Sequence, residues 1–330
     1  MKYNQLGRTG LFVSEICLGA MTFGGGVDAG IWKAIGSIGQ DGVDKIIGHA
    51  LAAGVNFIDT ADVYSFGQSE RVVGQSLKNL GVARKDVVVA TKVYGEMGPG
   101  PNDRGASRGH IMDSVRGSLE RLQTDYIDLY QIHGNDSVTP IDETLRAMDD
   151  LVKQGKVRFI GHSNFDGAMT NAAAKVSSTA KISAFISAQN HYSLLTRDIE
   201  KDLVAACEAN GVGILPYFPL ESGMLTGKYK RGEKPAEGTR LATWAARMPG
   251  ATERFMNDAA FAKVEKLQAL ADKSGTTLLS MAFGWLLNKP YIGSVIAGAT
   301  KPEQVESNVK AAAWRPTPGI NAEIEKITAG

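Results

Sequence analysis

Four polar residues of this 330-residue sequence stand at or just beyond the ends of short apolar runs. Asp59 ends the run VNFID, and Tyr64 follows it five residues later. Lys92 ends DVVVATK, and His133 ends YIDLYQIH. Each residue alone has a structural explanation, as a turn cap, a half-buried ring, a solvated strand end or a core histidine. Their equivalent positions favour one shared site.

A carboxylate, a phenol, an ammonium and an imidazole could together deliver a proton to a carbonyl oxygen. Tyrosine titrates near ~10, which is too high for an efficient acid at neutral pH. An ammonium at Lys92 would favour the phenolate and lower the pKa of Tyr64. Asp59 would keep Lys92 charged, and His133 would orient the carbonyl or relay the proton. The set fits a reaction in which a hydride reaches the neighbouring carbon, and positioned proton transfer is typically worth ~10²–10⁴ in rate.

The elements that must position these residues follow from the alternation of apolar runs with amphipathic stretches. The runs predict strands at 14–21, 55–59, 86–92, 126–133, 156–163, 182–189, 212–217 and 292–298. The amphipathic stretches predict helices at 41–54, 69–81, 108–123, 141–155, 166–177, 198–211 and 302–313, and within 258–288. Repeated strand–helix units favour parallel strands joined by right-handed crossovers.

Eight such units close most economically into a barrel. We therefore predict a single α/β domain over residues 1–330, a (β/α)₈ TIM barrel with an N-terminal β-hairpin and long active-site loops. The Gly-Arg-Thr-Gly turn in MKYNQLGRTGLFVS predicts that hairpin, at the bottom of the barrel. A doubly wound sheet is the alternative. In a barrel the carboxyl ends of all strands share one face, so the four polar residues would meet there.

The segment FGGGVDAG (23–30) comes close to a dinucleotide-binding glycine motif. Ala29 fills the position of the last glycine, and the next strand-end acid, Asp59, lies too far along the chain. The glycines lead into the segment GIWKAIGSIGQ (30–40), which we interpret as a mobile loop that carries an exposed Trp32.

Composition narrows the class of protein. The chain is 43% hydrophobic and 22% charged with a net charge of +1, which offers no electrostatic reason to expect nucleic acid or a membrane as a partner. No apolar run reaches the ~18 residues of a membrane span, and the first residues lack the apolar segment of a signal peptide. Cys17 and Cys207 lie in apolar segments, which suits core residues in a reducing compartment. We expect a cytoplasmic protein, and the histidines show no metal-ligand spacing.

Six motifs carry a resemblance to a known family. They are FIDTADVYSFGQSE (57–70), ATK (90–92), IDLYQIHG (127–134), GKVRFIGHSNF (155–165), YFPLESGMLTGKY (217–229) and AGATKPEQVESN (297–308). In these motifs the sequence resembles the aldo-keto reductases, from its N-terminal hairpin to about residue 313. It is similar in particular to the bacterial branch that also resembles potassium-channel β-subunits.

The resemblance implies a catalytic tetrad of Asp59, Tyr64, Lys92 and His133, with Tyr64 as the general acid. It also implies a nicotinamide cofactor. Ser163, Asn164 and Gln189 would bind the carboxamide, and Tyr217 would stack on the nicotinamide ring. The remaining cofactor residues would hold the pyrophosphate (Leu220 to Lys228, with Ser222) and the adenosine with its 2′-phosphate (Arg240, Gly298, Thr300, Lys301, Gln304 and Asn308).

Two departures from the family pattern bear on cofactor choice. Ser307 stands where a glutamate commonly precedes the asparagine of the adenosine clamp, and Gln304 stands where many members use arginine to bind the 2′-phosphate. The resemblance therefore implies NADPH, with NADH possible.

The short tail after the last predicted helix implies a pocket covered mostly by the 22–40 and 218–257 loops. Trp32 would line the substrate site, and so would Tyr94, which lies two residues beyond Lys92.

The leading hypothesis is an oxidoreductase that reversibly reduces an aldehyde or ketone to the alcohol with NADPH. A nicotinamide-binding regulatory subunit with slow turnover is the alternative, and a phosphate-binding barrel isomerase is a third class, which the HSNF, YFPL and GKY segments oppose. The expected partner is a small-molecule carbonyl substrate. The sequence determines neither its identity nor the oligomeric state.

Overall fold

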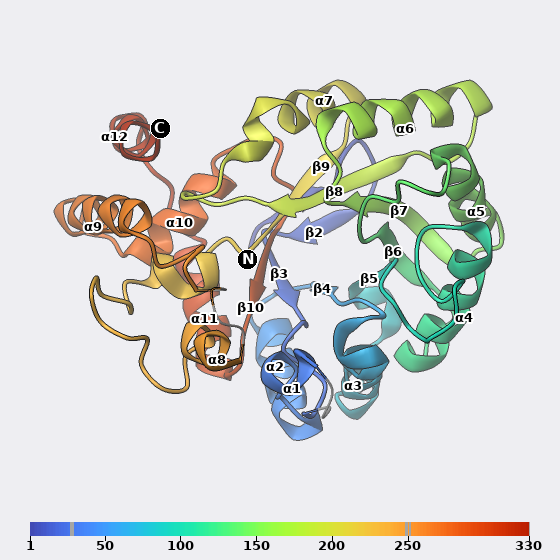
Figure 1. The fold of residues 1–330 in the computed structure, drawn as a ribbon, viewed down its shortest axis with the longest axis horizontal. Coiled ribbons are helices and arrows are strands. Elements are labelled where there is room, and N and C mark those ends of the chain that lie inside the picture. Colours follow the sequence, from blue (N-terminus) through green and yellow to red (C-terminus); the bar gives the residue numbers. More distant parts are fainter. Residues whose placement is uncertain (27–29, 248–249, 251, 330) are drawn as a thin grey trace.

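The protein folds into a barrel of eight parallel strands surrounded by helices (Figure 1). The computed structural model describes residues 1–26, 30–247, 250 and 252–329. The strands follow one another in the order β10-β3-β4-β5-β6-β7-β8-β9. Their bounds are β3 Ile16–Gly19, β4 Phe57–Asp59, β5 Val88–Val93, β6 Ile127–Ile132, β7 Val157–Ser163, β8 Phe185–His191, β9 Gly213–Tyr217 and β10 Val295–Gly298. All eight predicted strands are confirmed.

Backbone hydrogen bonds bring the first and last strands of this order together. The amide of Ile214 in β9 donates to Tyr291 O at 2.8 Å, and the amide of Gly293 donates to Ile214 O at 2.9 Å. On its other side β10 pairs in parallel with β3, Val295 lying opposite Ile16. The sheet is therefore a nearly closed barrel, and the doubly wound alternative is wrong.

The predicted helices lie on the outside of the barrel (Figure 1). Several begin at a side chain that accepts a hydrogen bond from the third helical amide, as Ser107, Asp166 and Thr277 do. Their bounds are α2 Gln40–Ala52, α3 Gln68–Asn79, α4 Arg108–Leu122, α5 Ile141–Lys153, α6 Gly167–Ala180, α7 Leu203–Asn210, α9 Asp258–Lys273, α10 Leu278–Leu287 and α11 Pro302–Ala311. Short 3₁₀ helices occur at η1 Tyr64–Gly67, η2 Arg84–Asp86, η3 Asp198–Lys201 and η4 Glu221–Thr226.

The predicted N-terminal hairpin is present. Strands β1 Tyr3–Gln5 and β2 Phe12–Ser14 pair antiparallel. Leu6 and Val13 of this hairpin are fully buried. They pack in a small core cluster with Cys17 and Phe57 of the barrel strands. The hairpin thus caps the lower end of the barrel with apolar side chains.

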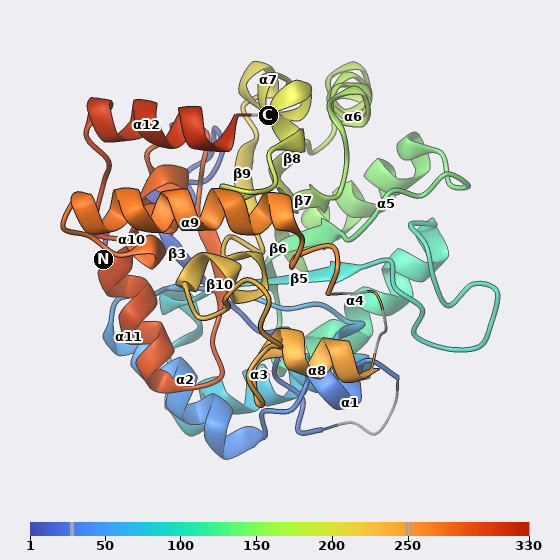
Figure 2. The same cartoon turned by 60° about the vertical axis from the view of Figure 1, so that its left-hand side comes forward.

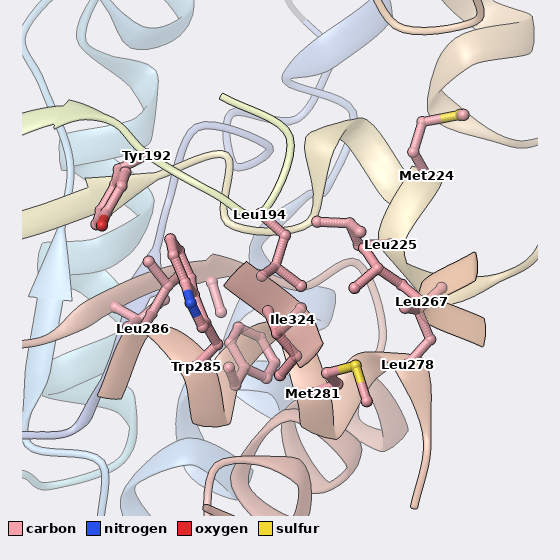
Figure 3. Packing of buried hydrophobic residues seen from close by; sticks show 14 of the residues in the cluster. Tyr192, Leu194, Met224, Leu225, Leu267, Leu278, Met281, Trp285, Leu286 and Ile324 are labelled. Atoms are coloured by element: carbon pink, nitrogen blue, oxygen red, sulfur yellow. The ribbon is translucent and has the colours of Figure 1, made fainter. Parts of the chain in front are cut away.

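One of two large core clusters lies between strands β8 to β10 and the C-terminal helices (Figure 3). Tyr192, Leu225, Met281 and Trp285 are almost completely buried in it. Cys207 is buried in the same cluster, so both cysteines are core residues, as expected. Among the described residues, no helix combines the length and apolar composition needed to cross a bilayer.

Three helices lie where the sequence analysis predicted loops or a short tail. They are α1 Trp32–Ile35, α8 Arg240–Arg247 and α12 Pro318–Thr328. Trp32 is 8% exposed, so the expectation of an exposed tryptophan is wrong. The part of the predicted loops that comprises residues 27–29, 248–249 and 251 lies outside the described residues.

Helix α12 runs alongside α9 at the outside of the molecule in both views (Figure 2). Thr317 caps it by accepting from the amide of Ile320, and Pro318 occupies its first turn, where proline is well tolerated. Glu325 then ties the helix to the barrel. Its carboxylate accepts from Trp285 Nε1 at 2.9 Å and pairs with Arg197 at 2.6 Å.

We predict that Glu325→Gln lowers the free energy of unfolding by roughly 1 kcal/mol, because it removes a partly exposed ion pair and weakens a hydrogen bond to a charged acceptor. Denaturation in urea measures the change. Glu323→Gln, on the exposed side of the same helix, is the matched control and should leave stability unchanged. Equal stability of the two variants would show that the carboxylate of Glu325 does not anchor the tail.

Candidate active site

The carboxyl ends of β4 and β5 bring three of the predicted tetrad residues together. Lys92 Nζ lies 2.6 Å from Asp59 Oδ2 and donates to Tyr64 Oη at 3.3 Å. It also donates to the backbone oxygen of Thr60 at 2.8 Å. The side chain of Lys92 is fully buried, and that of Asp59 is nearly so. The barrel thus places a buried ion pair directly beside the tyrosine hydroxyl.

Two further rings flank Tyr64. His133 follows β6, and its ring meets that of Tyr64 edge to face, with centroids 5.6 Å apart and an interplanar angle of 74°. Trp32 opens α1, and its ring centroid also lies 5.6 Å from that of Tyr64. The structure therefore brings the fourth tetrad residue and the predicted substrate-site tryptophan into contact with the ring of Tyr64.

Asp59 has two partners beyond Lys92. Its Oδ1 accepts from Gln131 Nε2 at 3.0 Å and from Gln189 Nε2 at 2.9 Å. Gln131 was missed by the sequence analysis, although it lies two positions before His133 and so on the same face of β6. Gln189 was predicted to bind a carboxamide, and its NH₂ group is here engaged with Asp59. Both oxygens of the buried carboxylate are thus satisfied.

The electrostatics of Tyr64 differ from the sequence-based expectation. Burial raises the pKa of Tyr64 above its ordinary value, and this outweighs the lowering effect of Lys92. Burial would lower the pKa of Lys92, but Asp59 and Tyr64 raise it overall. Burial, together with Lys92, holds the pKa of His133 well below its usual range. At neutral pH the site therefore contains a protonated phenol, an ammonium and a neutral imidazole.

Lys92 lowers the pKa of Tyr64, as predicted, but burial raises this pKa by more, so the net shift is upward. The reason is physical: the phenolate loses more hydration on burial than one ammonium at 3.3 Å restores. Lys92 limits the rise in pKa rather than reversing it.

The backbone after Tyr64 is strained. Ser65 and Phe66 have φ values of 50° and 51°, in the left-handed region that non-glycine residues rarely adopt. Gly24 and Gly36 allow the preceding loop to pack onto Ser65, because an added Cβ would lie 2.4 Å and 2.0 Å from Ser65 Oγ. This close packing holds the loop that carries Trp32 against Tyr64.

The ends of β7 and β9 join the same face. Asn164 has a φ of 62°, and its Nδ2 donates to the backbone oxygen of His133 at 2.9 Å. Tyr217 Oη donates to Asn164 Oδ1 at 2.8 Å, and Ser163 Oγ donates to the backbone oxygen of Gln189 at 2.8 Å. The residues predicted to hold a nicotinamide thus form one hydrogen-bonded group next to His133.

A groove of about 510 Å³ contains most of the other predicted cofactor residues. No acidic side chain lines it among the described residues. The predicted residues that line it are Leu220, Ser222, Lys228, Arg240, Gly298, Thr300, Lys301, Gln304 and Asn308. The sequence analysis missed the lining hydroxyls of Thr22, Ser37, Thr239 and Thr243, which no periodicity distinguishes from ordinary loop residues. It gave Ser307 only as a departure from the family pattern.

The chemistry of the groove fits a phosphate-bearing cofactor. Ser222 Oγ is buried and has no hydrogen-bond partner within the described part of the chain. Lys228 lies across Gly223, since a Cβ there would come 2.6 Å from Lys228 Nζ. Arg240, whose pKa is lowered by burial, has no ion-pair partner in the described ranges. An orphaned hydroxyl and cations without acidic neighbours are the groups that bind phosphate.

Gln304 has a structural role that the sequence did not reveal. Its Oε1 accepts from the backbone amide of Thr300 at 2.7 Å and from Thr300 Oγ1 at 3.2 Å. The glutamine therefore holds the turn that precedes α11 and carries Lys301.

Tyr94 lies at the rim, where its hydroxyl donates to the backbone oxygen of Asn135 at 2.9 Å. Its contact with a substrate stays a prediction. The described residues contain no group of three or more histidine, cysteine, aspartate or glutamate side chains that could hold a metal ion.

Comparison with known proteins agrees with this geometry. A profile of the aldo/keto reductase family matches residues 15–329. The chain is 37% identical to a probable voltage-gated potassium channel subunit beta of Oryza sativa subsp. japonica, over 99% of this chain and 96% of that protein. The chain belongs to the aldo/keto reductase family. This membership supports a general oxidoreductase role.

Two further relatives have names that describe enzymes. The uncharacterized oxidoreductase YrpG of Bacillus subtilis is 35% identical, over 94% of this chain and 91% of that protein. The versiconal hemiacetal acetate reductase of Aspergillus parasiticus is 32% identical, over 96% of this chain and 94% of that protein.

This aldo/keto reductase also contains a buried acidic pair behind the active-site loop. Glu70 accepts from Thr91 Oγ1 and Arg121 Nε, both at 2.6 Å. Asp62 is fully buried, and its Oδ2 has no partner in the described ranges. Burial, and then the charge of Glu70, raise the pKa of Asp62 to about 8. Asp62 therefore keeps its proton at neutral pH, two residues before Tyr64.

We predict that Asp62→Asn removes a pH dependence of stability. The pKa of Asp62 is raised from 3.8 to about 8, so the folded protein holds a proton that the unfolded chain releases as pH rises across this window. Wild-type stability should therefore fall relative to the variant as pH increases, and urea denaturation at several pH values measures the difference. The exposed Asp125→Asn is the matched control. A wild-type-to-variant difference that stays constant with pH would contradict a protonated Asp62.

Proposed function

We propose that the protein catalyses the reversible NADPH-dependent reduction of an aldehyde or ketone to the alcohol, with Tyr64 as the general acid. The observation that carries the proposal is the Tyr64 hydroxyl, 3.3 Å from the buried Lys92 ammonium. The 510 Å³ groove gives further support, because its described lining residues include basic side chains and no acidic one. A proton donor beside a phosphate-binding groove is what nicotinamide-dependent carbonyl reduction requires.

The chain offers binding groups for both ends of the cofactor. Lys228, Arg240 and Lys301 would neutralise its phosphates, and Ser222 would donate a hydrogen bond to one of them. Asn164, Ser163 and Gln189 would bind the carboxamide, and the ring of Tyr217 would pack on the nicotinamide. When bound, the nicotinamide supplies the hydride. The cationic lining favours NADPH, and the absence of an arginine at position 304 leaves NADH as a weaker alternative.

The side chains of the tetrad would handle the proton. Tyr64 Oη donates its proton to the carbonyl oxygen, and the Lys92 ammonium stabilises the phenolate that remains. Asp59 keeps Lys92 in place, with Gln131 and Gln189 holding the second carboxylate oxygen. His133, neutral because of burial and Lys92, orients the carbonyl oxygen. Trp32 covers Tyr64 and restricts water. In the oxidative direction the phenolate takes the proton back.

We predict that Tyr64→Phe abolishes most carbonyl reduction, by ~10²–10⁴-fold, because the phenyl ring has no proton to donate. The NADPH dissociation constant should change little, because we propose that the Tyr64 hydroxyl contacts the substrate and not the cofactor. Steady-state rates and fluorescence titration measure the two effects. Tyr126→Phe is the matched control: Tyr126 lies between the guanidinium groups of Arg84 and Arg158, away from the tetrad. Near-wild-type activity of Tyr64→Phe would show that Tyr64 is not the general acid.

A regulatory subunit that binds nicotinamide and turns over slowly is the second candidate, favoured by the potassium channel subunit beta among the relatives. Oxidation of NADPH with an aromatic aldehyde separates the two functions. An enzyme gives many turnovers per active site, whereas a sensor gives at most one slow turnover. We expect multiple turnovers in the wild type and none above background in Tyr64→Phe.

Recognition of the 2′-phosphate yields a further prediction. Lys301→Ala should raise the dissociation constant of NADPH on the order of tenfold and that of NADH much less, because only NADPH offers the second phosphate charge. Lys310→Ala, exposed at the end of the same helix and outside the groove lining, is the control. Equal effects on both cofactors would remove Lys301 from 2′-phosphate recognition.

A further inference from the structure

His191, the last residue of β8, occupies a central position that the proposed mechanism does not use. It lies two residues beyond the strand predicted at 182–189, and it pairs in register with Tyr217 at the end of β9. The two rings stack with centroids 5.5 Å apart and an interplanar angle of 17°. His191 therefore supports the ring assigned to the nicotinamide.

Both nitrogens of His191 have hydrogen-bond partners. Nδ1 lies 3.1 Å from Arg254 Nη2, and Nε2 lies 2.8 Å from Glu221 Oε1. A guanidinium can only donate, so Nδ1 must accept, and the ring proton must sit on Nε2, where it is donated to Glu221. Only a neutral imidazole makes both bonds at once. We call Arg254, His191 and Glu221 the His191 bridge.

On one side the bridge holds a strained turn of the cofactor groove. Glu221 and Ser222 have φ values of 47° and 55°, both in the left-handed region. Burial alone would raise the pKa of Glu221, but hydrogen bonds from His191, Ser193 and Thr196 keep it below its usual range. The anchored carboxylate fixes the turn that presents Ser222 to the groove.

On its other side the bridge holds the segment from Thr252 to Asn257. Phe255 of this segment is buried, and its ring lies 5.6 Å from that of Trp244 and 6.4 Å from that of Phe218. Trp244 and Phe218 both line the groove. The segment thus supports the groove wall from behind, with Phe255 as an apolar contact and Arg254 as a polar one.

We propose that His191 is a positioning residue whose neutral imidazole joins the Thr252–Asn257 segment to the Glu221 turn, so that its protonation separates them and weakens cofactor binding. Protonated His191 cannot accept from Arg254, and the two cations then repel each other. The bond to Glu221 survives in either state.

Three charged groups act on the imidazole from different elements. Glu221 in η4 and Asp198 in η3 favour the protonated form, and Arg254 opposes it. The remaining neighbours, Tyr217 and Phe218, are neutral rings. The bridge needs the neutral imidazole, so a positive charge on the ring of His191 would open it on the Arg254 side.

The proposal rests on the proposed cofactor binding, and its test compares variants at equal pH so that protonation of the ligand's own phosphate cancels. The probe is NADP⁺, titrated calorimetrically at about pH 8 and about pH 5.5. If protonation opens the bridge, Arg254→Gln should raise the dissociation constant roughly five- to tenfold at the higher pH and by much less at the lower pH.

Two backgrounds sharpen the comparison. In His191→Asn the amide oxygen accepts from Arg254 at every pH, so Arg254→Gln should have the same effect at both pH values. In the control His49→Gln, an exposed helical histidine remote from the groove, the pH dependence should persist. An effect of Arg254→Gln that is absent at both pH values, or equal at both in the wild-type background, would overturn the proposal.

A second readout is independent of the cofactor. Amide hydrogen exchange at Phe255 and Met256, whose amides donate to Thr252 O at 3.0 Å and 2.8 Å, reports on the segment itself. In Arg254→Gln these two amides should exchange faster than in the wild type at about pH 8, and at the same rate as in the wild type at about pH 5.5. If NADP⁺ fails to bind the wild type, the proposed function is wrong. If NADP⁺ binds but exchange and affinity show no pH-dependent difference, only the role of His191 is wrong.

Discussion

The buried ion pair of Lys92 and Asp59 is the interaction on which the active site depends. An ammonium removed from water is costly unless it is paired and hydrogen-bonded. Here Lys92 has Asp59 Oδ2 at 2.6 Å and the oxygen of Thr60 at 2.8 Å, while Gln131 and Gln189 satisfy the second oxygen of Asp59. These groups come from separate strands, so only a closed barrel brings them within bonding distance.

This ion pair sets the electrostatic environment of the rings around it. Lys92 opposes the effect of burial on Tyr64 and adds to the effect of burial on His133. The result is a phenol that keeps its proton beside an imidazole that does not gain one. A deprotonated Tyr64 would have the ammonium as an immediate counter-charge, which suits the role of general acid that we propose for it.

Backbone strain is concentrated on the same face of the barrel. Ser65 and Phe66 follow the proposed acid, Asn164 follows β7, and Glu221 with Ser222 opens the cofactor loop; all have left-handed φ values. Such conformations persist only where surrounding contacts enforce them, and they tend to gather at functional sites. Here the contacts are identifiable: tight glycines beside Ser65, a bond from Asn164 to His133, and the His191 bridge at Glu221.

The sequence by itself determined the strands, most of the helices and the barrel, because apolar periodicity is a local property and eight strand–helix units have one economical closure. It also predicted that Asp59, Tyr64, Lys92 and His133 would lie together, since strand ends of a barrel converge on one face. Only the tertiary structure decided the pKa shift of Tyr64, the role of Gln131, the docking of α12 and the bond between His191 and Arg254. Each of these depends on desolvation or on distances between residues far apart in the chain, and no local pattern encodes them.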